Sequence, residues 1–382
     1  MNLSHRATCE IYHRNMPVPT PPPQELRFCR SADGAQIAYA IHGRGPALVV
    51  DACWLSHLQY DWQSPVWRHY LHEWGAYGTV VRFDERGHGL SDRNVTDHSL
   101  EARVADLEAV VDGSGVGRFV LFAMAQGGPV AITYAARHPE RVAGLIFYGS
   151  YAFAGRDETP DDVAMNDAFE RLIEVGWARP ESEFRRVFSS MMIPGGTEEQ
   201  RSWLDELQRV TVDTETALRS RRQRKRADAT GLLPTLTAPT LVVHSLGDRM
   251  NDFGQARHLA ANIAGARLVA LESDNHIVLE DEPAWPVLAE EMRRFVAEVS
   301  GLAPVGSATD GHNADDGIAV LSDREVEVLR LASRGLDNDG IAAALTLSPR
   351  TVERHLQNAY AKLGVSGRSA RTAAVARLLA GA

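Results

Sequence analysis

The sequence predicts an α/β protein with a mostly parallel sheet and a helical cap, followed by a small all-α domain. Between residues 25 and 298, short apolar runs of strand length alternate with helix-like segments. This alternation is typical of a parallel sheet that helices cover on both faces. A stretch at 299–317, rich in Gly, Ala, Ser and Asp, predicts a flexible linker. Helical patterns resume in residues 318–382, which predicts a second domain there.

The composition is that of an ordinary globular protein that can bury a full core. The chain has 382 residues, 44% of them hydrophobic and 24% charged, and this length favours two domains. Its apolar runs are shorter than the roughly 20 residues that a membrane span needs. No secretory signal is visible, so we expect a cytoplasmic location and no membrane partner. The three cysteines show no metal-like spacing and no paired framework, and we predict neither a metal nor a cofactor.

The charge is distributed unevenly along the chain. The formal net charge is −10, whereas residues 318–382 contain nine basic and six acidic side chains and so carry +3. The rest of the chain therefore carries −13. A basic-leaning end on an acidic body suggests that only this end approaches an anionic partner.

The first elements follow from turn signals and strand-length apolar runs. Residues 1–24 include the proline-rich run 17–23, and we expect them to form a disordered extension. Two strands are expected to form a hairpin around Asp33 and Gly34. The expected strands are Leu26–Arg30, Gln36–Ile41, Ala47–Asp51, Thr79–Phe83, Phe119–Phe122, Gly144–Tyr148, Thr240–His244 and Arg267–Leu271, with helices at Leu100–Val111, Val130–Arg137 and Pro283–Val299.

Residues 151–236 interrupt this alternation with apolar residues at helical spacing. We expect them to form a helical cap over the carboxyl ends of the strands, where ligands bind in open α/β sheets. More ordinary core remains the alternative. The arginine-rich run at 219–226 is interpreted as the solvated face of a cap helix rather than as a nucleic-acid patch.

The turn at Phe122-Ala123-Met124-Ala125-Gln126-Gly127-Gly128 follows a predicted strand and precedes a predicted helix. This is the context of the G-x-S-x-G nucleophile elbow. The position of the nucleophile holds Ala125, so ordinary serine catalysis from this turn is unavailable.

Two further residues stand where a Ser-His-Asp site would place them. Asp248 follows the predicted strand at 240–244, and His276 follows the next strand, in the order nucleophile, acid, histidine. Taken singly, a turn aspartate and a core or surface histidine are the commoner interpretations. Taken together, the positions favour the acid and the base of a former triad.

With the glycine-rich turn at 83–91, this arrangement resembles the α/β-hydrolase family over about residues 25–298. The resemblance implies an oxyanion hole made by backbone N–H groups of Gln126 and of the loop at Cys53 and Trp54. The sequence departs from the family pattern at Ala125, at Ala123 in place of the first elbow glycine, and in the oxyanion loop 51–54, which has no glycine. Cys53 as a substitute nucleophile is the less favoured alternative.

These features predict a ligand site close to Asp248 and beneath the cap, for a small, mainly apolar molecule such as an ester or lactone. The expected ligand-binding residues are Cys53, Trp54, Ala125, Gln126 and His276. Two explanations of Ala125 stay open. The alanine is natural in a domain that binds without catalysis, or it was introduced in place of a serine in an enzyme that hydrolyses its own signal. We favour a binding domain over an enzyme.

The C-terminal region predicts a helix-turn-helix. Ser322 and Glu325 form a capping-box pattern, and the first helix is expected to stop at Gly335. A short helix follows at about Asp339–Leu345, and Ser348 caps a third helix at Pro349–Leu363. The apolar positions of the third helix that are expected to pack inward are Val352, Leu356, Ala359, Tyr360 and Leu363.

The motifs at 321–329, 341–342, 347–355 and 362–365 together resemble the LuxR-type (FixJ/NarL-like) DNA-binding domain over about residues 318–382. The resemblance implies binding of double-stranded DNA and a homodimer joined partly through a last helix at about Ser369–Leu379. The residues implied to face base edges are Glu353, Arg354 and Gln357, and those implied to contact the backbone are Arg350, Thr351 and Lys362. The hypothesis is therefore a ligand-responsive transcription regulator; a three-helix protein-interaction module is the alternative for this end.

Overall fold

The computed structural model describes residues 23–301, apart from 52–54, 157–158 and 181–182, and most of 321–365 together with Ala374. The chain folds into two compact units, Met1–Val305 and Gly306–Ala382. Nearly all of the expected N-terminal extension and linker lies outside the described residues. Each unit is described by itself.

The larger unit is built on an eight-stranded sheet with the order β1-β2-β4-β3-β5-β6-β7-β8. The pairs β1–β2 and β2–β4 are antiparallel and all others are parallel, which confirms the expected mostly parallel sheet. The strands are β1 Glu25–Arg30, β2 Gln36–Gly43, β3 Ala47–Val50, β4 Thr79–Phe83, β5 Phe119–Met124, β6 Val142–Tyr148, β7 Thr240–Ser245 and β8 Arg267–Leu271.

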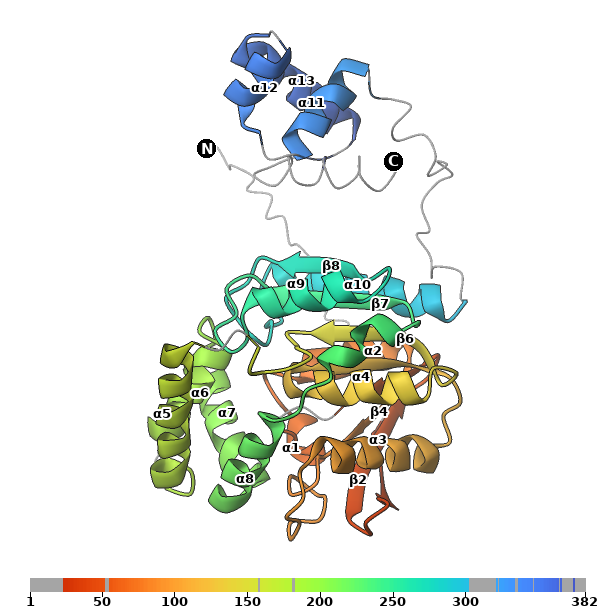
Figure 1. The fold of residues 1–382 in the computed structure, drawn as a ribbon, viewed down its shortest axis with the longest axis vertical. Coiled ribbons are helices and arrows are strands. Elements are labelled where there is room, and N and C mark those ends of the chain that lie inside the picture. The colour runs from red at the N-terminus through yellow and green to blue at the C-terminus, as the bar shows by residue number, and fades with distance from the viewer. Residues whose placement is uncertain are drawn as a thin grey trace, which may run out of the picture. The chain divides into compact units, whose positions relative to one another are not determined.

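Helices cover both faces of this sheet (Figure 1). Neighbouring residues of the central strands point to opposite faces, so Leu48 and Val120 lie in one apolar cluster and Val49 and Leu121 in the other. The first cluster includes helices α2 and α10, and the second includes α3, α4 and α9. These elements are α1 Leu58–Asp61, α2 Arg68–Tyr77, α3 Leu100–Ser114, α4 Gly128–Arg137, α9 Phe253–Asn262 and α10 Ala284–Val299.

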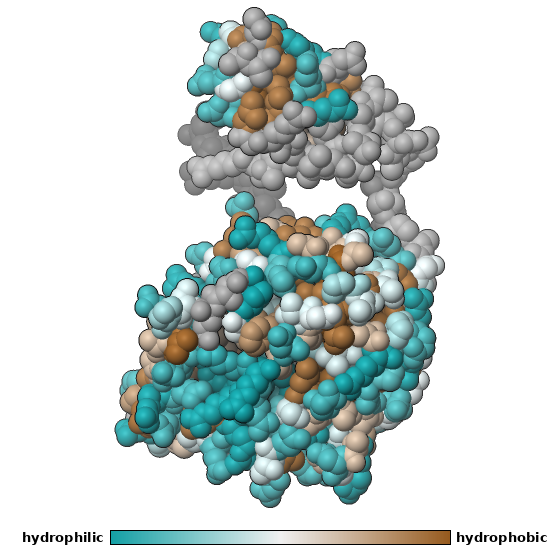
Figure 2. All heavy atoms as spheres, viewed as in Figure 1, coloured by the Kyte–Doolittle hydropathy of each residue, from teal (hydrophilic) through white to brown (hydrophobic). Residues whose placement is uncertain are grey.

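Four helices between β6 and β7 stand beside the sheet as a separate group (Figure 1), as expected for a cap. They are α5 Pro160–Gly176, α6 Glu183–Met192, α7 Glu198–Thr211 and α8 Thr214–Arg224, followed by a 3-10 helix η2 at Thr230–Thr235. Side-chain caps fix where three of them begin: Thr159, Thr197 and Asp213 each accept a backbone N–H of the first turn. Hydrophilic residues dominate the visible face over α7 and α8 (Figure 2).

The sequence-based interpretation of 219–226 as a solvated face is wrong for part of α8. Arg222 is exposed and pairs with Glu170, as a surface residue would. Arg224 is only 5% exposed, and Arg221 is half-buried and donates from Nη2 to Asn166 Oδ1 at 2.8 Å. Positions 221 and 224 are three residues apart and so share one face of the helix. The run of charged residues on both sides of them gave no sign that this face is buried.

A buried ion cluster joins the cap to the sheet. Glu85, in the loop after β4, accepts from Arg224 Nη2 at 2.5 Å and lies 3.2 Å from Arg103 Nε on α3. Burial alone would raise the pKa of Glu85, but the charges of Arg224 and Arg103 outweigh it and hold the pKa far below its ordinary value. The carboxylate therefore stays ionised and binds two elements at once.

The smaller unit contains three helices within its described residues: α11 Asp323–Ser333, α12 Asn338–Leu345 and α13 Pro349–Lys362. The expected inward positions of α13 are all buried, with Val352 and Ala359 fully so. Ser348 caps α13 by accepting the Thr351 N–H at 3.1 Å, as predicted. Ser322, Gly335 and nearly all of 369–379 lie outside the described residues.

We predict that Glu85→Gln lowers the free energy of unfolding by about 3–5 kcal/mol, because it leaves two buried guanidinium groups without their carboxylate. Urea denaturation measures this. Glu101→Gln is the control, since Glu101 pairs with Arg137 at the surface and is 69% exposed; such a pair is worth about 0–1 kcal/mol. Because the pKa of Glu85 is depressed, its contribution is present at neutral pH and is lost only as the pH falls through that depressed value. Equal effects of the two substitutions would contradict this account.

Candidate functional site

The turn after β5 has the backbone of a nucleophile elbow. Ala125 has φ = 46°, and among the described residues no other non-glycine residue has a positive φ. It begins the 3-10 turn η1 (Ala125–Gly127), from which α4 continues directly. The left-handed conformation costs a residue with a β-carbon roughly 1–2 kcal/mol. The methyl group of alanine makes no use of this strained conformation. In a nucleophile elbow, the same conformation presents the side chain of the nucleophile.

Close packing holds the turn in this conformation. A β-carbon on Gly128 would stand 2.0 Å from the Tyr151 carbonyl oxygen, so only glycine fits there. Ser150 Oγ donates to the Ala125 carbonyl at 2.7 Å, and Arg103 Nη2 donates to the Gln126 carbonyl at 2.8 Å. The elbow is therefore bonded to the loop after β6 and to α3.

Asp248 and His276 come together at the ends of β7 and β8. His276 Nδ1 lies 2.7 Å from Asp248 Oδ2, and the Asp248 side chain is 1% exposed. Burial opposes ionisation of Asp248, but the charge and hydrogen bond of His276, with the N–H of Met250, outweigh it and lower the pKa of this carboxyl. The backbone N–H of His276 donates to the Met192 carbonyl at 2.8 Å, and this bond links the loop that carries the histidine to the cap.

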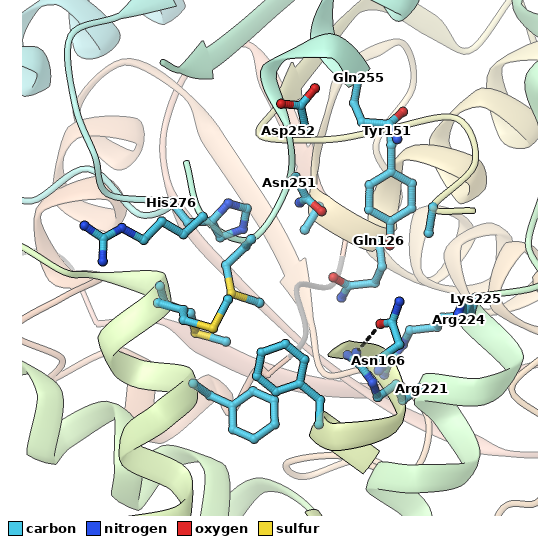
Figure 3. A pocket seen from close by; sticks show the side chains of 18 of the residues that line it. Gln126, Tyr151, Asn166, Arg221, Arg224, Lys225, Asn251, Asp252, Gln255 and His276 are labelled. Atoms are coloured by element: carbon cyan, nitrogen blue, oxygen red, sulfur yellow. Dashed lines mark hydrogen bonds between the residues drawn. The ribbon is translucent and has the colours of Figure 1, made fainter. Parts of the chain in front are cut away.

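Ala125, Gln126 and His276 line one cavity of about 570 Å³ between the strand ends and the cap helices (Figure 3). Five of the eight methionines of the chain line it. Methionine side chains are flexible and polarizable, and so adapt to ligand shape. The apolar lining consists of Trp67, Met124, Ala154, Met165, Phe169, Phe188, Met191, Met192, Met250 and Ile277.

The wall of the cavity that lies across from His276 is polar. Figure 3 shows Gln126, Asn166 and Arg221 grouped across the cavity from His276, with Arg224 and Lys225 beside them. Tyr151 and Gln255 lie along the same wall. Sequence reasoning missed this group; the available signal was the i, i+3 spacing of arginines 221 and 224 on an expected cap helix.

The loop expected to supply the second oxyanion donor is only partly described, since Cys53 and Trp54 lie outside the described residues. Asp51, just before them, is 3% exposed. Its Oδ2 atom lies 2.7 Å from the point where a β-carbon on Gly127 would stand. A carboxyl group is therefore packed against the elbow.

The outer face of α13 carries the side chains predicted to contact DNA. Arg350, Glu353, Arg354 and Gln357 are exposed, and Thr351 is half-buried. Their contacts with DNA stay a prediction. Lys362 Nζ donates to the buried Glu325 at 2.8 Å, which gives this lysine a part in joining α13 to α11 beside its predicted DNA contact.

Two family models match the chain. Residues 78–283 match the alpha/beta hydrolase fold, and residues 319–375 match the bacterial regulatory proteins of the luxR family. The chain is 52% identical over 48 residues to a putative HTH-type transcriptional regulator of Mycobacterium bovis, a match that covers 13% of this chain and 5% of that protein.

Relatives of the larger unit are hydrolase-fold proteins. The chain is 26% identical over 272 residues to the AB hydrolase superfamily protein YisY of Bacillus subtilis, covering 68% of this chain and 92% of that one. An esterase structure from a Rhodococcus species superposes with a TM-score of 0.61 at 25% identity, covering 72% of this chain and 99% of the esterase. No helix within the described ranges is long and apolar enough to cross a membrane.

We predict that Arg354→Ala weakens binding to a DNA site selected from random duplexes by about 1–3 kcal/mol and relaxes its sequence preference. Arg350→Ala, at a predicted phosphate contact, weakens binding to all sequences alike and reduces the salt dependence. Fluorescence anisotropy on selected and unrelated duplexes over a range of salt measures both. Loss of affinity in Arg354→Ala that is equal for all duplexes would contradict base readout by this residue.

Proposed function

We propose a function from one premise: the chain belongs to the alpha/beta hydrolase fold family and joins that fold to a LuxR-type helix-turn-helix, and so is a DNA-binding regulator. The finer proposal is that the hydrolase-fold unit is a ligand sensor without serine catalysis. It binds a small, mainly apolar molecule of the ester or lactone class in the cavity beside Ala125, Gln126 and His276. We propose that the regulator acts as a homodimer on paired half-sites in the cytoplasm.

The observation that carries the proposal is the elbow that faces a cavity without a nucleophile. A strained turn, a hydrogen-bonded acid and histidine, and a cavity of about 570 Å³ are all present, while Ala125 offers only a methyl group. A cleft that retains its shape but not its nucleophile suits binding better than turnover.

The loop beside the elbow supports binding without catalysis. An oxyanion hole stabilises negative charge that develops on the substrate, and its donors must face that charge. The loop 51–54, which the family resemblance implies for the second donor, has no glycine and so departs from the family pattern. A departure of this kind suits a neutral ester or lactone that is bound and not cleaved.

The regulatory part is tested on the full chain with its selected DNA site. A ligand regulates only if its affinity differs between the two states of the protein, so bound ligand must change DNA affinity. We expect at least one tightly bound ester or lactone to shift the DNA dissociation constant by about 5- to 150-fold, the usual range of such coupling.

Met191→Trp fills the cavity from α6, and we predict that it abolishes this ligand effect. Val187→Trp on the same helix is the matched control, because Val187 is 39% exposed and does not line the cavity. Isothermal titration with esters, followed by DNA anisotropy, checks both variants. Unchanged DNA affinity in the presence of every tight ligand would end the proposal of a switch.

The hydrogen-bonded Asp248–His276 pair favours a second candidate, a regulator that hydrolyses its own signal and whose serine Ala125 replaces. Our proposal predicts that Ala125→Ser stays inactive, because the loop 51–54 has no glycine and departs from the oxyanion-hole pattern of the family. Acyl-enzyme burst kinetics with p-nitrophenyl esters measures this. Turnover in Ala125→Ser that is lost again in Ala125→Ser/His276→Gln would support the second candidate instead.

A further inference from the structure

The polar wall of the cavity holds an arginine whose charge has no counterion at ion-pair distance. Among the residues that the structure describes, no carboxylate forms an ion pair with Arg221. Its guanidinium donates from Nη2 to Asn166 Oδ1 at 2.8 Å and lies over the ring of Phe169, with Cζ 5.7 Å from the ring centroid. Burial lowers the pKa of Arg221, and Tyr151 and then the charge of Glu170 oppose this only in part. Glu170 itself is paired with Arg222 at 2.8 Å.

The neighbouring arginine shows the contrast. Arg224 also lines the cavity, but Glu85 accepts two hydrogen bonds from it, at 3.1 Å and 2.5 Å. Arg224 is thus ion-paired with a buried carboxylate, which it shares with Arg103, whereas the contacts of Arg221 are a neutral amide and an aromatic face. A half-buried guanidinium with neutral partners is a favourable place for a carboxylate, which it can bind through two parallel hydrogen bonds.

The cavity has two ends of different character. At the elbow, Ala125 offers only a methyl group, with His276 also in the cavity wall. Across the cavity from His276, Arg221 stands with Asn166 and Gln126 (Figure 3). Methionine and aromatic side chains line the space in addition to these polar groups. A ligand that suits both ends is neutral at the elbow, apolar in the middle and anionic at Arg221.

We propose that the ligand is an amphipathic organic acid whose carboxylate binds Arg221, with its uncharged ester or lactone group beside Ala125 and His276. This rests on the proposed function and names the ligand class of the same cavity. Asn166 holds the guanidinium in place and faces the carboxylate with it. Arg221 is thereby a specificity-determining residue that selects acids over neutral esters of the same length.

Matched esters test this on the full chain. The monomethyl esters of linear dicarboxylic acids from adipate to sebacate carry one carboxylate, and the dimethyl esters of the same acids carry none. We expect the best monomethyl ester to bind about 10- to 100-fold more tightly than its dimethyl partner, the effect of one charge-assisted hydrogen-bonded pair. Isothermal titration gives both dissociation constants.

Arg221→Gln should abolish this preference by lowering the affinity for the monomethyl ester to that for the dimethyl ester. An unfolding midpoint close to that of the unsubstituted protein shows that the variant is still folded. Arg222→Gln is the control on the same helix, because Arg222 is exposed and does not line this cavity. It should retain the preference. Equal binding of the two ester series, a preference that survives Arg221→Gln, or no binding of any monomethyl ester at millimolar concentration would overturn the proposal.

The experiments distinguish a failure of the proposed sensor function from a failure of the proposed carboxylate site. Dimethyl esters that bind and shift DNA affinity, with no preference for the acids, would refute the carboxylate site and leave the sensor function intact. Monomethyl esters that bind through Arg221 without any change in DNA affinity would refute the switch and leave the carboxylate site intact.

Discussion

The ion cluster of Glu85 with Arg103 and Arg224 is the interaction on which the site depends. Arg103 binds Glu85 on one side and donates to the Gln126 carbonyl on the other, while Arg224 brings α8 of the cap to the same carboxylate. The elbow, the sheet and the cap are therefore positioned by one buried charge. Because a buried charge without its partners is costly, these three parts cannot shift independently without loss of stability. The cavity owes its defined shape to this coupling.

The elbow keeps a strained backbone although residue 125 is an alanine. Ala125 still adopts φ = 46°, and the lack of space around Gly128 forces the turn to stay tight. The strain does not depend on the side chain at 125, because packing against Tyr151 and the hydrogen bond from Ser150 fix the backbone there. The shape of the turn is therefore set by its surroundings, and a change of the side chain at 125 need not alter the backbone.

The sequence was a good guide to the sheet and a poor one to the cavity wall. Strand positions follow from apolar runs and turn signals, which are local, and all eight expected strands are present. The meeting of Asp248 and His276 could be expected because the ends of parallel strands converge. The role of Arg221 could not, since it depends on Asn166 and Phe169 of α5, which is distant in sequence. The spacing of apolar residues in the sequence predicts which face of a helix a residue lies on. It does not predict which other helix that face contacts.

The two arginines of α8 show how one charge run serves two purposes. Arg224 is ion-paired with the buried Glu85 and so links the cap to the fold. Arg221, one turn earlier, keeps its charge because its partners are neutral. Glu85 forms an ion pair with Arg224 of α8. An acid bound at Arg221 would form a second ion pair with the same cap helix. The ligand would then hold the cap in place through an ion pair, as Glu85 does. The position of the cap would in this way depend on whether the ligand is bound.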